Sequence, residues 1–168
     1  MELIEAIETR ASSGRLTGPG PTPEHLALIL KAASQAPDHG RLKPWRIIAL
    51  ADAARETFNE AVVAARRGRQ PAPSEEQIEA ERAKISRSPT LVIVGCVVTP
   101  NHPKVPEVEQ LLASGAAAQN LFLAAHALGY GVMWKTGPAA YDAGVKASVG
   151  LTPADHIVGI MHLGTRVS

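Results

Sequence analysis

Cationic and hydroxyl side chains gather just after the first predicted helix. Arg10, Ser12 and Arg15 follow one another closely in this loop. An arginine beside a hydroxyl can clamp a phosphate, because the planar guanidinium offers paired, charge-assisted donors. The same residues also fit an arginine that balances the negative end of a helix dipole, followed by a solvated loop. From these residues alone, this second explanation is favoured.

A second group of cations surrounds the turn between a predicted helix and a predicted strand. The stretch reads APDHGRLKPWRI and places His39, Arg41 and Lys43 just before Trp45. Two cations beside a neutral histidine could hold an electron-rich ring or an anionic intermediate. Exposed turn residues would give the same pattern, so this group does not identify a site by itself.

Residues 134–137 close another predicted strand and carry an indole, an amine and a hydroxyl in succession. In open α/β sheets, ligands tend to bind just beyond the ends of strands. This segment is therefore a third candidate, and it is as weak as the others when taken alone.

Helices and strands that could position these groups alternate along the chain. Apolar spacing and capping residues predict helices at residues 1–10, 23–36, 52–66, 74–86, 107–128 and 140–149. Apolar, β-branched runs predict strands at residues 45–50, 90–98, 130–137 and 156–164. The helix at 107–128 carries few charges on any face, which predicts burial in the centre or at a subunit interface. The alternation indicates an α/β domain of two or three layers.

Composition favours one folded domain over residues 1–168. Apolar residues make up 45% and charged residues 20%, and a net charge of +1 provides no global field for nucleic acid or acidic membrane. Cys96 is the only cysteine and lies in an apolar run, so we expect a buried thiol and no internal disulfide. No apolar run approaches the roughly 20 residues of a membrane span. The acidic N-terminus is unlike a signal peptide, and we expect a cytoplasmic protein.

Two common nucleotide-binding signals are absent from the sequence. No glycine-rich G-x-G-x-x-G turn follows the first strand, and there is no Walker-type phosphate loop. A standard dinucleotide-binding fold is therefore not supported.

Four segments taken together are more specific than any single group. They read RASSGRL, APDHGRLKPWRI, GAAAQNLFLAAHALGYGVMWKTG and IVGIMHLGT. In order and spacing, they resemble the nitroreductase family of FMN-dependent oxidoreductases, and in particular its compact YdjA-type branch. The resemblance implies an α+β fold in three layers, α/β/α, with a central mixed sheet flanked by helices. It also implies a homodimer with two FMN sites at the subunit interface.

The resemblance carries functional roles over to individual residues. Arg10 and Ser12 match the positions that hold the FMN phosphate and ribityl chain, whereas Ala11 stands where the family usually has a second arginine. His39 matches a flavin-contacting histidine contributed by the other subunit. The predicted cofactor-binding residues are Arg10, Ala11, Ser12, Gln35, His39, Arg41, Trp134, Lys135 and Thr136.

Some positions depart from the family pattern. Gln35 replaces an arginine of the branch, and Arg41 and Lys43 replace an asparagine and a glutamine, so the contacts to the flavin ring are left open. Relatives continue past the last strand into an arm that wraps the partner subunit, whereas the given sequence ends at Ser168. The stability of the dimer and part of the active-site wall are therefore also left open.

Flavin chemistry sets few demands on the protein. A cation such as Lys135 or Arg41 near a reduced flavin would stabilise its negative charge. We expect hydride to pass from NADH or NADPH through FMN to an electron-poor small molecule, such as a nitroaromatic or a quinone, by a ping-pong mechanism without a protein nucleophile. A protein that holds FMN without turnover, and other flavin chemistry such as dehalogenation, are the alternatives.

The remaining histidines and cations have simpler explanations. His102 lies near two glutamates, but a structured loop and a helix N-terminus account for them, and no metal site is predicted. His126 is expected to be a satisfied core or interface histidine. His156 and His162 are evenly spaced on a strand, which predicts one shared face. Residues 66–70, RRGRQ, are expected to form a solvated loop without nucleic-acid contact.

Overall fold

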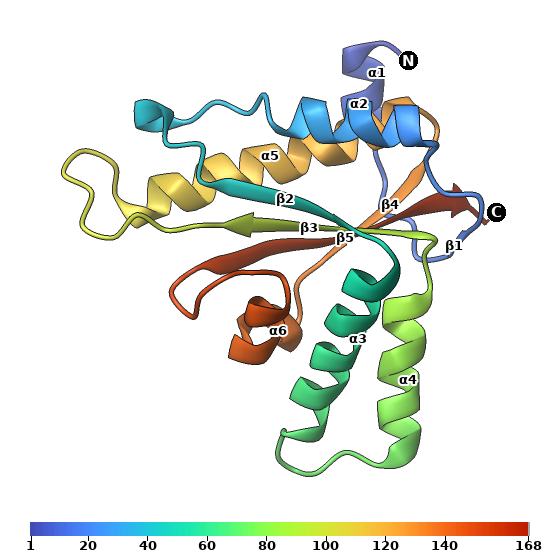
Figure 1. The fold of residues 1–168 in the computed structure, drawn as a ribbon. Helices are drawn as coiled ribbons and strands as arrows, with labels where there is room; N and C mark the ends of the chain where they lie inside the picture. The colour runs from blue at the N-terminus through green and yellow to red at the C-terminus, as the bar shows by residue number, and fades with distance from the viewer. Residues whose placement is uncertain (168) are drawn as a thin grey trace.

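Helices cover both faces of a single central sheet in the computed structural model, which describes residues 1–167 (Figure 1). The helices are α1 (Leu3–Thr9), α2 (Pro23–Ala33), α3 (Asp52–Arg67), α4 (Glu75–Ser86), α5 (Glu107–Ala127) and α6 (Ala143–Ser148), with short 3-10 turns η1 (His39–Arg41) and η2 (Pro138–Tyr141). The strands are β1 (Leu16–Thr17), β2 (Trp45–Leu50), β3 (Thr90–Cys96), β4 (Gly131–Lys135) and β5 (His156–Arg166).

Local signals in the sequence account for most of these boundaries. Thr22 caps α2 by accepting the N–H of His25, and Ser74 and Gln77 form the predicted capping box of α4. The helix predicted at 140–149 is shorter than expected, because η2 occupies its start and Asp142 caps α6 by accepting the N–H of Val145. The strand β1 was not predicted, since two residues are too short to show a pattern.

The sheet has the order β1-β5-β3-β2, and β4 pairs with the other edge of β5. Every pair of named strands is antiparallel. Within residues 1–167 the sheet is mixed only through one isolated parallel bridge, between Ser12 and Val132. Beyond this bridge, β4 has an open edge in the described chain.

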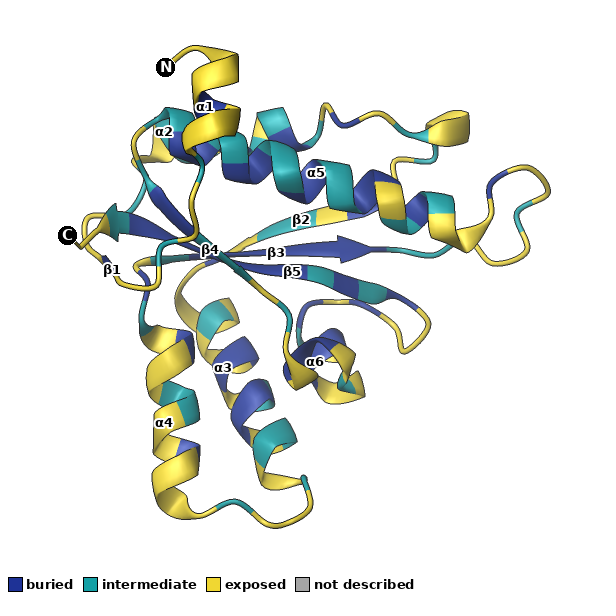
Figure 2. Cartoon of the chain, turned by 180° about the vertical axis from the view of Figure 1, so that it is seen from behind, coloured by how far each residue is buried: buried dark blue, intermediate teal, exposed yellow. Residues whose placement is uncertain are grey.

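Two apolar cores separate the three layers. On one face, α2 and α5 cover the sheet, with Ile29 and Leu121 packed in a core that also contains Val92 and Val94. On the other face, α3, α4 and α6 cover it, and Phe58 is fully buried in the second core. Figure 2 shows β3 buried along almost its whole length between the two layers, as its continuous apolar run predicted. The three-layer α+β fold is confirmed.

The single cysteine lies inside this sheet. Cys96 is a free thiol and is fully buried, as predicted. Burial raises the pKa of its thiol, so the group stays protonated and unreactive at neutral pH.

None of the helices in residues 1–167 combines the length and hydropathy that a bilayer span requires.

A β-bulge interrupts the register between β3 and β5. Ile157 pairs with Gly95, but the next pair joins Gly159 to Val94, so Val158 has no counterpart on β3. An extra residue of this kind reverses the alternation of the side chains beyond it. Before the bulge, the even-numbered side chains of β5 face α5. After the bulge, the odd-numbered side chains do.

The bulge separates the two histidines of β5. His156 lies on the α5 side, where its Nε2 is 2.7 Å from Oε1 of Glu107. His162 lies on the opposite side and is buried, with its Nδ1 2.9 Å from Oγ of Ser88. The prediction that both histidines share one face is wrong, because even spacing fixes the face only in an unbroken strand.

Candidate functional site

Two arginines and the loop that contains Ser12 and Ser13 meet at the start of β4. Arg10 directly follows α1, and Arg166 is the last residue of β5. The N–H of Ser13 donates to the carbonyl of Val132 at 2.8 Å, which fastens the loop to β4. A Cβ added at Gly131 would lie 2.9 Å from Oγ of Ser13 and 2.7 Å from Cγ of Arg166. The loop and the ends of the two strands are therefore in close contact.

A buried histidine of α5 orients Arg166. The guanidinium of Arg166 donates to Nδ1 of His126, and Nε2 of His126 lies 2.9 Å from Oγ1 of Thr9. The hydroxyl of Thr9 itself donates to the carbonyl of Glu5 at 2.6 Å, so Nε2 must carry the hydrogen of the His126–Thr9 bond. Nδ1 is then free to accept from Arg166. This fixes one neutral tautomer of His126.

The surroundings of His126 favour the same neutral form. Burial, followed by the charges of Arg166 and Arg10, lowers the pKa of His126. Both ring nitrogens have partners, so the prediction of a satisfied buried histidine is confirmed. Its contact with Arg166 was not predicted, because the two residues belong to different elements.

The guanidinium groups at this end of β4 are held in place but not neutralised. The Cζ atom of Arg10 lies 5.0 Å from the centroid of the Phe122 ring, a cation–π geometry. Neither Arg10 nor Arg166 forms an ion pair with a carboxylate in the part of the chain that the structure describes. Two unpaired guanidinium groups beside Ser12 and Ser13 are a donor set suited to a phosphate group. We name this group, Arg10, Ser12, Ser13 and Arg166, the phosphate cluster.

Two other residues of the predicted first motif contribute little here. Ala11 is exposed and has no polar side chain, and the side chain of Arg15 is exposed. Arg166 replaces them as the second cation of the cluster. The sequence signal for Arg166 is slight, a lone cation just after the last apolar strand.

The predicted turn lies at the other end of α5. Nδ1 of His39 is 2.5 Å from Oε2 of Glu109, in the first turn of α5, whereas Arg10 lies over Phe122 near its last turn. These positions on α5 are about 20 Å apart along a helix with a rise of 1.5 Å per residue. Within one chain, His39 therefore lies far from the phosphate cluster. A shared site requires the turn of a second chain.

The backbone of this turn is strained. Gly40, Arg41 and Lys43 have φ values of 73°, 56° and 48°, and the two cations occupy a region that L residues rarely adopt. Oδ2 of Asp38 accepts the N–H of Lys43 at 2.8 Å. Trp45 is buried against α5 and anchors the turn on the sheet. Strain that the surroundings maintain is typical of functional segments.

Gln35 precedes the turn and contacts neither the phosphate cluster nor residues 134–136. Its side chain is exposed and reaches only Ser34, at 3.4 Å. The structure therefore does not bring Gln35 together with Arg10 or Lys135.

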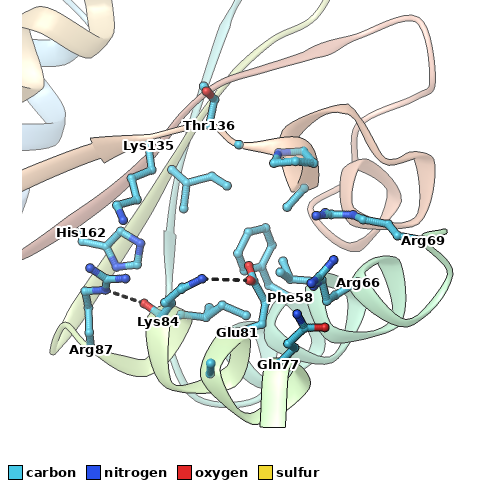
Figure 3. Close-up of a pocket in the computed structure, with 17 residues that line it drawn as sticks. Phe58, Arg66, Arg69, Gln77, Glu81, Lys84, Arg87, Lys135, Thr136 and His162 are labelled. Atoms are coloured by element: carbon cyan, nitrogen blue, oxygen red, sulfur yellow. Dashed lines mark hydrogen bonds and ion pairs between the residues drawn. The ribbon is translucent and has the colours of Figure 1, made fainter. Parts of the chain in front are cut away.

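A cleft of about 640 Å³ opens at the end of β4, between the sheet, α3, α4 and η2 (Figure 3). The predicted residues Lys135 and Thr136 line it. The core side chains Phe58, Val62 and Ile160 lie behind it and are almost fully buried. Four further cations, which were not predicted as site residues, also line it: Arg66, Arg69, Lys84 and Arg87. The expectation of a purely solvated loop at residues 66–70 is wrong for Arg66 and Arg69, because the packing of α3 against α4 brings them to the cleft.

Positive charge dominates this cleft. Among residues 1–167, Glu81 is the one carboxylate that lines it, and it lies 3.6 Å from Nζ of Lys84. Burial, followed by the charges of Arg87 and Lys84, lowers the pKa of Lys135. Burial, followed by Arg87, Lys135 and Arg55, lowers the pKa of His162 to about 4. The cleft is therefore suited to a ligand that combines an apolar ring with negative charge.

An apolar groove lies on the other face of β4. Trp134 lines it and donates its indole N–H to the carbonyl of Val158 at 3.0 Å. Val108 and Leu112 of α5 border the groove and are 59% and 68% exposed. Thr136 lines both the groove and the cleft. The three predicted residues 134–136 thus divide between two sides of the strand, and Thr136 lies at their junction.

Comparisons with known proteins identify related chains. The model of the Nitroreductase family matches residues 7–165. A "Putative NAD(P)H nitroreductase YdjA" from Escherichia coli (strain K12) is 34% identical, over 98% of this chain and 88% of the relative. A "Putative NAD(P)H nitroreductase" from Haemophilus influenzae is 31% identical, over 98% of this chain and 89% of the relative.

Solved structures show the same fold. A nitroreductase-like family protein from Bacillus cereus superposes with a TM-score of 0.83 at 24% identity, and the match covers 100% of this chain and 87% of the other. A nitroreductase with bound FMN from Bacteroides fragilis has a TM-score of 0.76 at 23% identity, with coverage of 99% and 89%.

The low pKa of His162 predicts a loss of stability in acid. The unfolded chain takes up this proton near the ordinary histidine pKa of 6.5, whereas the folded chain resists it down to about 4. Stability should therefore fall as the pH falls through this range, and His162 alone should contribute a loss of roughly 2 kcal/mol between pH 7 and pH 5. Urea unfolding of the parent and of His162→Gln at both pH values measures it. Between pH 7 and pH 5, the free energy of unfolding of the variant should fall by roughly 2 kcal/mol less than that of the parent. An equal fall in both proteins would contradict the assignment.

Proposed function

The chain belongs to the nitroreductase family, whose members are oxidoreductases, and from this premise we propose that it is an FMN-dependent NAD(P)H oxidoreductase. One observation carries the proposal for this chain. The phosphate cluster lies at the start of β4, and the cationic cleft opens at the end of the same strand. A ligand with a phosphate at one end and a planar ring at the other matches this arrangement.

The residues fit FMN in their donor chemistry. Arg10 and Arg166 supply two uncompensated guanidinium groups for the phosphate, and Ser12 adds a hydroxyl. From Gly131 to Lys135, β4 spans about 13 Å at the rise of an extended strand, and its open edge leaves backbone groups for a ribityl chain or ring edge. Lys135 and Thr136 lie where the ring would rest.

When bound, FMN supplies the hydride transfer between the nicotinamide and the acceptor. The chain's own residues would position the bound ring and polarise it. Lys135, Lys84 and Arg87 supply positive charge at the end of β4, which favours the acceptance of electrons by a bound ring. His162 stays neutral and adds no further charge. Because the cofactor carries the hydride chemistry, no protein nucleophile is needed. Alternating use of one open site by nicotinamide and acceptor gives a ping-pong mechanism, with nitroaromatics or quinones as acceptors.

A homodimer completes the proposed site. Exposed apolar side chains lie on α1, at Leu3, Ile4 and Ile7, and on α5, at Val108 and Leu112. Apolar surface of this kind is typical of a protein interface. A second chain packed there can bring its own turn at His39 towards the start of β4, which the distance along α5 forbids within one chain. Arg41 reaches the site in the same way.

The visible spectrum tests the proposed function directly. The purified protein is incubated with FMN, freed of excess, and treated anaerobically with NADPH and then NADH. We expect retained flavin that bleaches with at least one nucleotide. Retained flavin that does not bleach identifies a flavin-holding protein instead, and protein that retains no flavin contradicts the proposal.

Substitution of either arginine of the phosphate cluster should weaken FMN binding. Arg10→Ala and Arg166→Ala each remove a charge-assisted bond, with an expected loss of roughly 1.5 to 3 kcal/mol, or about ten- to a hundredfold in Kd. Quenching of flavin fluorescence measures Kd. Arg46→Ala is the matched control, because Arg46 is exposed on β2 at the opposite edge of the sheet. An unchanged Kd for Arg10→Ala removes Arg10 from the site.

A charge on the exposed face of α5 should break the dimer. Leu112→Glu places a carboxylate among apolar side chains, where burial without a partner is costly. Sedimentation velocity should show a dimer for the parent and monomer for the variant. Leu28→Glu, on an exposed position of α2 outside the groove, is the control and should remain dimeric. A dimeric Leu112→Glu protein would place the interface elsewhere.

A further inference from the structure

The cationic cleft continues beyond the end of β4. Its inner end is formed by Lys135, Arg87 and His162, where the flavin ring is proposed to lie. Figure 3 shows Arg66 and Arg69 on the opposite side, with Phe58 between the two ends. The outer end is therefore a separate part of the same cavity.

Arginines near this cleft fall into two classes. Arg67 forms two bonds to the carboxylate of Glu75, at 2.7 and 3.0 Å, and Arg82 pairs with Glu60. Neither Arg67 nor Arg82 lines the cleft.

The arginines at the outer end are not paired in this way. Arg66 and Arg69 are half-buried at the cleft, and neither forms an ion pair with a carboxylate among residues 1–167. The dipole of α3 favours cations in its last turn, which accounts for Arg66 and Arg67 alike. It does not account for Arg69, which lies beyond the end of the helix, nor for the difference in pairing.

Polar side chains form the accessible lining of the outer end. Phe58 and Val62 lie behind it in the core and are only 0% and 2% exposed. Arg66 and Arg69 offer planar donor forks, and Gln77 adds an amide. In the described part of the chain, no carboxylate that lines the cleft is free to pair with them, since Glu81 lies 3.6 Å from Lys84. A ligand with a negatively charged oxygen group would pair with Arg66 and Arg69 and neutralise their charge.

We propose that Arg66 and Arg69 form an oxyanion subsite, which selects substrates that carry a phosphate or carboxylate away from the reacting ring. The proposal rests on the proposed function, because it assigns the inner end of the cleft to the flavin. Two sources share this chemistry. One is a phosphate of the nicotinamide dinucleotide, and the other is an acidic group on the electron acceptor.

Half-reactions of the FMN-loaded enzyme separate the two sources. Stopped-flow reduction compares NADPH with NADH, which differ only in the 2′-phosphate. Stopped-flow reoxidation compares 4-nitrobenzoate with the neutral 4-nitrobenzamide. The test variant is Arg66→Gln/Arg69→Gln, and the control is Arg67→Gln/Arg82→Gln, which changes the net charge equally outside the cleft.

The test variant should lose roughly tenfold or more in apparent affinity for the charged member of one pair, as expected for lost charge-assisted bonds. A loss for NADPH relative to NADH assigns the subsite to the 2′-phosphate. A loss for 4-nitrobenzoate relative to the amide assigns it to the acceptor. Calorimetric titration of the oxidised holoenzyme with NADP⁺ and with 4-nitrobenzoate gives a second readout that does not depend on turnover.

The failure of this proposal can be told from the failure of the proposed function. Protein that takes up no FMN, or whose flavin no nucleotide reduces, contradicts the proposed function. Protein that takes up FMN and is reduced normally, but whose test variant matches the control with all four compounds, overturns the oxyanion subsite alone.

Discussion

The pairing of β5 with β3 on one edge and β4 on the other is the constraint on which the site depends. It leaves β4 at the border of the sheet, with one edge open past Val132. Both ends of β4 are then reached by side chains from other elements. The bulge at Val158 adds a second effect, because it directs His156 to the α5 side and His162 to the cleft. One inserted residue thus decides which histidine faces which cavity.

Charge is distributed unevenly around this frame. On the outer surfaces of α3 and α4, Arg67 pairs with Glu75 and Arg82 with Glu60. At the start of β4 and in the cleft, the described guanidinium groups lie without a carboxylate partner, and of the two lysines in the cleft Lys84 alone pairs, with Glu81. Their mutual repulsion is offset by structural contacts, such as the aromatic ring beneath Arg10 and the neutral imidazole beside Arg166. The fold therefore maintains positive charge where it would gain most from an anionic ligand.

The sequence predicted the layers better than the cavities. Helical spacing and the continuous apolar run of β3 located the main elements, because these signals are local. Of the site residues, the ones in contiguous motifs, Arg10 and Lys135, do line the two ends of β4. Arg66 and Arg166 could not be found in this way, since only tertiary packing brings them to the site. The error over the two histidines of β5 has a similar origin, because the bulge leaves no signal in the spacing of the residues.

The contact between Arg166 and His126 ties the two ends of the described chain together. Arg166 belongs to the last strand, and Thr9, on the other nitrogen of His126, belongs to the first helix. A ligand held by both Arg10 and Arg166 bridges the same two segments from outside. Such a ligand would add to the pairing of β1 with β5, which already joins the two ends of the described chain. It would act as a reversible cross-link between these ends. The concentration of the ligand would then influence how readily the first helix and the last strand fray.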